Sequence, residues 1–147
     1  MDNYVEKNGI EVKSGAKELL SFLKENGYKV ALATATPPQR AERYLKAHDL
    51  YKYFDVTVSA SMVSVGKPAP DIYLKAAEML GLSPQNCVAL EDSPNGIKSA
   101  SSAGCVTVMV PDLDKPSNDI IPLLHGVADG LSDVKRILRE LEDCNIQ

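Results

Sequence analysis

The pattern of hydrophobic and polar positions divides the chain into alternating helices and strands. From Gly15 to Asn26 leucines recur at helical spacing, and Gly27 follows as a helix stop. Short apolar runs without that spacing, such as Lys29 to Ala33, are typical of buried strands. The predicted helices cover residues 15–26, 39–48, 71–80, 95–103 and 132–141, and the predicted strands cover 29–33, 54–59, 87–90 and 106–110.

Strands that alternate with helices over short connections predict an α/β fold. We expect a Rossmann-like, three-layer αβα arrangement, with a mostly parallel sheet covered by helices on both faces. The 147 residues suffice for one domain over 1–147, and no repeat or linker interrupts them. Residues 112–130 are less regular and predict a loop with one short helix and one edge strand near Val127.

Composition and charge narrow the classes of partner. The net charge of −4 argues against non-specific binding to nucleic acid or to an anionic membrane, and no apolar run has the length of a membrane span. The cysteines are three in number and lack metal-ligand spacing, which predicts reduced thiols in a cytoplasmic protein. His48 and His125 suit surface or capping positions.

The most informative segment is an acidic pair at the end of a predicted strand, Glu91 and Asp92. Ser93 is a good N-cap and Pro94 suits the first helical position, so the backbone turns just after the pair. Carboxylates at the carboxyl end of a strand suit Mg²⁺, although the helix dipole alone would also favour acids here. Because neighbouring side chains on a strand point to opposite sides, we expect one acid to bind the metal and the other to brace a neighbour.

Two further segments follow predicted strands in the same way. Thr34, Ala35 and Thr36 offer hydroxyl and backbone N–H groups that could cradle a phosphate, the alternative being that the threonines cap the next helix. Lys67 lies between Gly66 and Pro68, and the rigid proline backbone aims an ammonium that could neutralise phosphoryl charge. The alternative for Lys67 is a solvated surface lysine.

These three segments, in this order, resemble the core domain of the haloacid dehalogenase-like (HAD) hydrolases, in the branch of β-phosphoglucomutase and small phosphatases. The resemblance runs from about residue 9 to residue 112 and rests on 31–36 (ALATAT), 66–71 (GKPAPD) and 90–93 (LEDS). It implies that Thr34 is the phosphate-binding hydroxyl and Lys67 the catalytic lysine. It also implies that Asp92 is the Mg²⁺ ligand, with Glu91 supporting the metal shell or Lys67.

The family's first motif, Asp-x-Asp-Gly-Thr, which carries the nucleophile, is absent from this sequence. The only aspartate before Thr34 is Asp2, which has no strand before it and no Gly-Thr after it. The resemblance therefore implies a truncated core that lacks the cap and the central first strand, with residues 1–12 as a remnant of the cap-to-core connection. We expect the sheet either to close, by pairing the strands that end near Thr34 and Asp92, or to borrow a strand from elsewhere.

The resemblance implies a Mg²⁺-dependent phosphatase, or a phosphohexomutase, acting on a small phosphorylated metabolite such as a sugar phosphate or a nucleotide-like compound. Phosphatase is favoured because the family's hydrolases are many and its mutases few. Without the nucleophile we expect the chain alone to be inactive. The alternative is a non-catalytic phosphate- or metal-binding remnant, or an interaction module that pairs with a complementary fragment or forms a strand-pairing dimer. An unrelated flavodoxin-like fold is disfavoured, because nothing in it requires Lys67 and the acidic pair.

Overall fold

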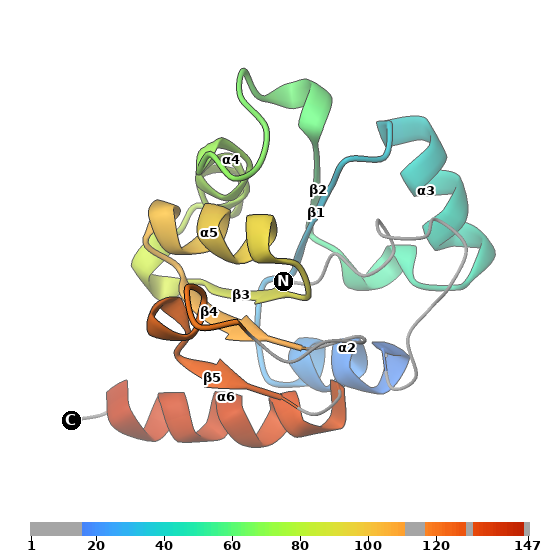
Figure 1. The fold of residues 1–147 in the computed structure, drawn as a ribbon. Helices are drawn as coiled ribbons and strands as arrows, with labels where there is room; N and C mark the ends of the chain where they lie inside the picture. The colour runs from blue at the N-terminus through green and yellow to red at the C-terminus, as the bar shows by residue number, and fades with distance from the viewer. Residues whose placement is uncertain (1–15, 111–116, 129–130, 146–147) are drawn as a thin grey trace.

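The computed structural model of the protein describes residues 16–110, 117–128 and 131–145 (Figure 1). Its main elements alternate along the chain between helix and strand. The helices are α2 (Ala16–Glu25), α3 (Pro38–Ala47), α4 (Asp71–Leu80), α5 (Pro94–Ala103) and α6 (Leu131–Asn145). The strands are β1 (Ala31–Thr34), β2 (Val56–Ser59), β3 (Val88–Glu91), β4 (Val106–Met109) and β5 (Gly126–Val127).

The helices and strands expected from the sequence are all present, with ends that shift by a few residues. The expected caps are confirmed: Ser93 Oγ accepts the Gly96 N–H at 3.1 Å at the start of α5. Gly81 ends α4 at a φ of 74°, a left-handed conformation that favours glycine. The irregular region contains the short helix and edge strand expected there, a 3₁₀ turn at Ile121–Leu123 and β5. Three more 3₁₀ turns, at Tyr51–Tyr53, Ala60–Met62 and Pro84–Asn86, were not predicted, because a single turn has no periodicity to detect.

The strands form a parallel layer with helices on both sides, as the α/β pattern predicts. Alternate residues of each strand face different helices, since side chains alternate across a strand. Val30, Leu32 and Leu90 belong to a core shared with α2 and α6. Ala31, Ala33 and Ala89 belong to a second core shared with α4 and α5, which lie on the opposite side of the layer in Figure 1.

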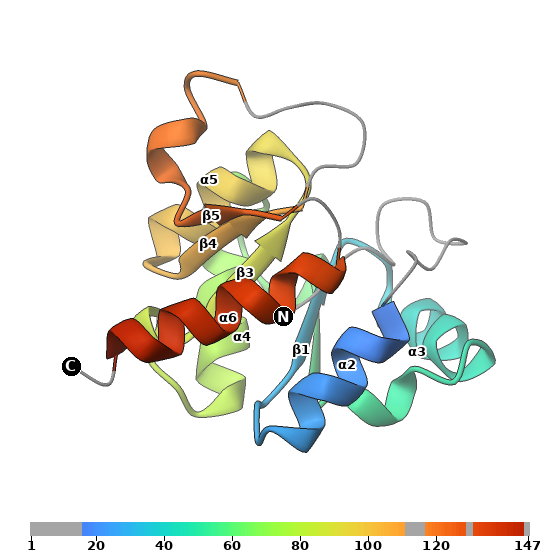
Figure 2. The same ribbon diagram turned by 90° about the horizontal axis from the view of Figure 1, so that it is seen from below.

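The layer is interrupted between β1 and β3. One sheet has the order β1-β2 and the other the order β3-β4-β5, and no strand pairing joins them among the described residues. Closure of the sheet by direct pairing of these two strands, one of the two outcomes expected, is therefore wrong. The two sheets nevertheless share both hydrophobic cores, so they form one layer with a gap, seen from below in Figure 2. Side chains of α2 and α6 belong to the core that contains residues of both sheets.

Some expectations lie outside the described residues. The segment 1–12, expected to be a remnant of the cap-to-core connection, and Asp2 within it are not described, nor is the side chain of Cys144.

Candidate functional site

A buried ion pair marks the carboxyl end of β3. Lys67 Nζ lies 2.7 Å from Glu91 Oε2, and the Tyr73 hydroxyl donates to the same carboxylate oxygen. The Glu91 side chain is 1% exposed and that of Lys67 17% exposed. In such surroundings each charge strongly stabilises the other, because little water screens them. Lys67 is thus held in place, and the alternative of a solvated surface lysine is not what the structure shows.

The loop that carries Lys67 leads directly into helix α4 and is hydrogen-bonded to helix α5. Tyr73 lies in the first turn of α4, just after the loop, and its side chain is fully buried. Ser99 of α5 donates its hydroxyl to the Ala69 carbonyl at 2.6 Å. The two helices therefore fix where Lys67 can reach.

Gly96 makes room for the Glu91 carboxylate. A Cβ atom placed on Gly96 would overlap all three carboxylate atoms of Glu91. Because Gly96 lies in the first turn of α5, the start of that helix can approach the end of β3 closely only where a side chain is missing. The position of Glu91 thus depends on a glycine five residues later in the chain.

Thr34 and Thr36 lie together at the carboxyl end of β1. The Thr36 N–H donates to Thr34 Oγ1 at 3.1 Å, and Ser59, at the end of β2, donates its hydroxyl to the Thr36 carbonyl at 3.1 Å. The next helix, α3, begins after Pro37 and receives no side-chain cap. The alternative that the threonines cap this helix is therefore wrong, and their hydroxyl and amide groups form a separate turn.

Asp92 follows Glu91 directly and is half-buried at the start of the turn into α5. Mg²⁺ takes oxygen ligands and usually shares one or two carboxylates with phosphate and water. The donor chemistry of this pair fits that pattern, with Glu91 already engaged by Lys67 and Tyr73. Within the described ranges there is no cluster of three or more His, Cys, Asp or Glu side chains able to hold a metal on its own, so further oxygen ligands would have to come from elsewhere.

The structure brings the expected residues into two groups at the carboxyl ends of parallel strands. Lys67 and Glu91 are in contact, whereas Thr34 makes its hydrogen bond within its own turn. Sequence reasoning missed Tyr73, Ser99 and Gly96, which support the site from the two helices. Tyr73 and Ser99 could have been identified from the sequence, because each places a hydroxyl on the inner, apolar face of its helix, where a polar side chain needs a partner.

The cysteines are poor candidates for a replacement nucleophile. Cys87 and Cys105 are buried free thiols in the core beneath α4 and α5. Burial raises the pKa of Cys105 to about 12 and also raises the pKa of Cys87. Because the thiolate is the reactive form, neither side chain is activated near neutral pH.

Comparison with known proteins agrees with this architecture. Residues 2–104 match the model of the haloacid dehalogenase-like hydrolases. A phosphorylated carbohydrates phosphatase of Thermotoga maritima is 40% identical over 124 residues, which cover 84% of this chain and 50% of the relative. Hexitol phosphatase B of Escherichia coli is 40% identical over 97 residues, covering 66% of this chain and 44% of the relative.

The solved structures lead to the same family. A putative β-phosphoglucomutase from Thermotoga maritima superposes with a TM-score of 0.77 at 35% identity, covering 86% of this chain and 59% of that one. The chain spans about half the length of the curated relatives it matches. In the described part of the chain, no helix combines the length and the apolar character needed to cross a membrane. With most of its length matched by the family model, the chain belongs to the haloacid dehalogenase-like hydrolases.

Proposed function

We propose that this chain supplies the phosphate-holding and metal-holding part of a phosphatase site for a small phosphorylated metabolite, with sugar phosphates as the favoured class. The observation that carries the proposal is the buried contact between Lys67 and Glu91 at the carboxyl end of β3. A lysine that is held by Glu91 and is still 17% exposed can reach a ligand at the sheet edge. The names of the relatives, which act on phosphorylated carbohydrates and hexitols, support the substrate class.

The residues have separate roles in this proposal. The hydroxyl of Thr34 and the backbone N–H groups of Ala35 and Thr36 bind phosphoryl oxygens, and Lys67 neutralises the charge that grows on them during transfer. Asp92 is the ligand for Mg²⁺, and Glu91 orients Lys67 and supports the metal shell. A bound Mg²⁺ would add further positive charge at the phosphoryl oxygens.

The attacking group is the part that this sequence does not provide. The Asp-x-Asp-Gly-Thr motif is missing from all 147 residues, and the buried thiols are not activated. We therefore propose that the chain alone does not turn over, and that a complementary segment supplies the nucleophile in a cytoplasmic enzyme. A phosphohexomutase remains the second reaction, supported by the β-phosphoglucomutase likeness.

A phosphate-binding and turnover experiment tests this function. Inorganic phosphate with Mg²⁺, titrated by calorimetry, is expected to bind, and Lys67→Met and Thr34→Val are each expected to weaken binding at least tenfold, since each removes a direct partner. Lys17→Met is the matched control, because Lys17 pairs with Asp49 on the surface and has no part in the site. Equal binding by all four proteins would contradict the proposal.

The second candidate function is a non-catalytic remnant or interaction module, which the missing nucleophile motif favours. Hydrolysis of p-nitrophenyl phosphate separates the two: we expect little or no turnover from the purified chain. Clear turnover that Asp92→Asn and Lys67→Ala abolish would exclude the remnant and would also show that our account of the missing nucleophile is wrong.

A further inference from the structure

Two dipeptides in the described part of the chain are Asn-Gly, a sequence in which asparagine is chemically labile. Asn26-Gly27 follows helix α2, and Asn95-Gly96 lies in the first turn of α5. A third, at 8–9, lies outside the described residues. In each, the backbone nitrogen of glycine can attack the side-chain amide of asparagine, because no Cβ on the glycine hinders the approach. The dipeptides therefore share one reaction, and their surroundings decide whether it takes place.

The reaction is a deamidation that needs only water as co-reactant. The glycine nitrogen loses its proton and forms a bond to Cγ of the asparagine, and the side-chain nitrogen leaves as ammonia. Water then opens the resulting five-membered imide. Opening at the bond to Cγ leaves an aspartate, whereas opening at the main-chain carbonyl leaves an isoaspartate, whose main chain runs through Cβ and Cγ. Either product has a carboxylate in place of an uncharged amide.

The folded structure closes this path at Asn95. The Gly96 N–H donates to Ser93 Oγ at 3.1 Å, so loss of its proton would also cost this hydrogen bond. Asn95 lies inside α5, and the imide ring requires a ψ angle that a helix does not allow. Asn95 is exposed but Gly96 is buried. The reaction can therefore begin only when the first turn of α5 opens.

The glycine that makes Asn95 labile is required by the packing of the site. A Cβ at Gly96 would overlap the carboxylate of Glu91, so no larger residue fits there without displacing that carboxylate. The lability of Asn95 thus follows from the close contact between α5 and the end of β3. The Ser93 cap, which stabilises the helix, also suppresses the reaction that this contact makes possible.

Asn26-Gly27 has the same chemistry without this cap. The Gly27 N–H donates to the Lys24 carbonyl at 3.3 Å, and both residues of the dipeptide are exposed. Gly27 lies beyond the end of α2, with a φ of 79°. Deamidation of Asn26 is therefore independent of Ser93, and Asn26 serves as an internal reference.

We propose that Asn95 is a site of spontaneous, irreversible deamidation that the Ser93 cap keeps closed in the folded chain. When the start of α5 opens, the isoaspartate product adds one methylene to the main chain directly before Gly96. Because Gly96 lies against the Glu91 carboxylate, the lengthened turn cannot return to its place without moving that carboxylate. Deamidation thus detaches the start of α5 from the end of β3. The reaction requires no phosphate, metal or turnover, so it is independent of the proposed function.

Peptide mapping by mass spectrometry measures both deamidation rates in one sample of the full chain, incubated in mildly alkaline buffer. The rate of each asparagine in urea is its own reference. In the folded chain Asn95 should react at least tenfold more slowly than in urea. Ser93→Ala removes the acceptor, so it should accelerate the reaction at Asn95 at least fivefold and leave Asn26 unchanged. Ser93→Thr keeps a hydroxyl and should react at the parent rate.

Ser99→Ala is the matched control, because it removes a hydroxyl hydrogen bond from the same helix and leaves the cap intact. It should not change the rate at Asn95. A second measurement is hydrogen exchange of the Ile97 N–H, which donates to the Ser93 carbonyl at 3.0 Å and should exchange at least tenfold faster in the purified isoaspartate form.

Four results would overturn the proposal. Asn95 would react as fast in the folded chain as in urea, or Ser93→Ala would leave its rate unchanged. Alternatively, Ser99→Ala would accelerate Asn95 as much as Ser93→Ala does, which would assign the effect to global stability. Finally, the Ile97 amide would keep its protection in the isoaspartate form, so that α5 would not be detached.

Discussion

At the scale of single residues, the site depends on a carboxylate that is enclosed on every described side. Glu91 contacts Lys67 and Tyr73, and Gly96 lies so close that a Cβ atom there would overlap the carboxylate. Desolvation of such a charge is costly, and the two donors offset that cost only while their geometry is maintained. A change that moves the carboxylate should therefore affect stability and ligand binding together.

Gly96→Ala tests this close contact. Alanine normally stabilises a helix by about 1 kcal/mol relative to glycine, but here its Cβ would displace the Glu91 carboxylate. We expect the free energy of unfolding to fall by about 2–3 kcal/mol, measured by urea denaturation. Gly66→Ala is the control, because nothing lies within 4 Å of a Cβ there, and it should change stability by less than about 0.5 kcal/mol. A stabilised Gly96→Ala protein would contradict the assigned geometry.

At the scale of elements, Asp55 connects helix α2 to strand β1. Its carboxylate accepts the Val30 N–H at 2.7 Å and the Lys24 amine at 2.8 Å, just before β2 begins. Burial acts to raise the pKa of Asp55, but Lys24 and the Val30 amide outweigh it, so the net pKa is lowered. The charged form thus stabilises the start of the β1-β2 pair.

Asp55→Asn should weaken this connection in a pH-dependent way. We expect about 1 kcal/mol less stability at pH 7, because a charge-assisted hydrogen bond is lost. Because the pKa of Asp55 is lowered in the folded state, its charged carboxylate stabilises the fold at pH values above the unfolded-state pKa of about 4. This stabilisation is lost as the pH falls through the folded-state pKa. The difference between the parent and the variant should therefore shrink between pH 5 and pH 3, as urea unfolding can measure. Asp49→Asn, which removes two exposed ion pairs, with Lys17 and with Lys52, should have no measurable effect. A difference in stability for Asp55→Asn that does not change with pH would contradict a role for the Asp55 charge.

At the scale of the whole molecule, periodicity predicted the order and type of the main elements because each is buried on a regular face. Glycine and Ser93 fixed several helix ends, since their backbone and capping preferences are local. The sequence could not predict whether β1 and β3 would pair or stay apart. That outcome depends on whether apolar packing or backbone pairing dominates between segments that are distant in the chain. Tyr73 was missed for a similar reason: its partner, Glu91, lies 18 residues away, and only the folded chain brings the two together.

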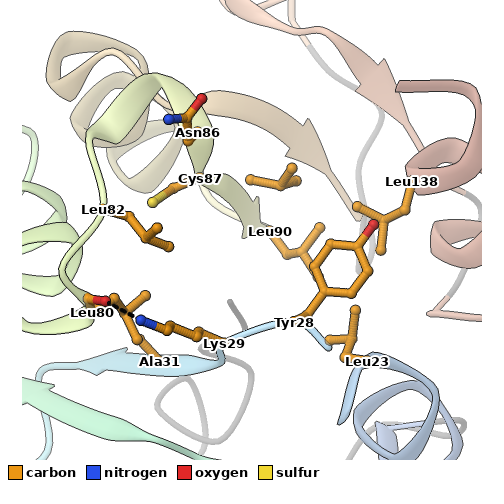
Figure 3. A pocket seen from close by; sticks show the side chains of 11 residues that line it. Leu23, Tyr28, Lys29, Ala31, Leu80, Leu82, Asn86, Cys87, Leu90 and Leu138 are labelled. Carbon is orange, nitrogen blue, oxygen red and sulfur yellow. Dashed lines mark hydrogen bonds between the residues drawn. The ribbon is translucent and has the colours of Figure 1, made fainter. Parts of the chain in front are cut away.

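The interrupted layer also predicts unequal access to two buried thiols. Cys87 lines a cavity between β1 and β3 (Figure 3), whereas Cys105 lies deeper in the same core and has a pKa raised to about 12 by burial. At pH 8 the Cys105 thiol is therefore almost entirely protonated, and its labelling requires the structure to open. In a Cys144→Ser background, the Cys105→Ser variant, which retains Cys87, should react with iodoacetamide at least tenfold faster than Cys87→Ser, which retains Cys105. Both should react rapidly and equally in 8 M urea. Equal rates in the native state would mean that both thiols are reached only by global unfolding, and the cavity beside Cys87 would then not be open to solvent.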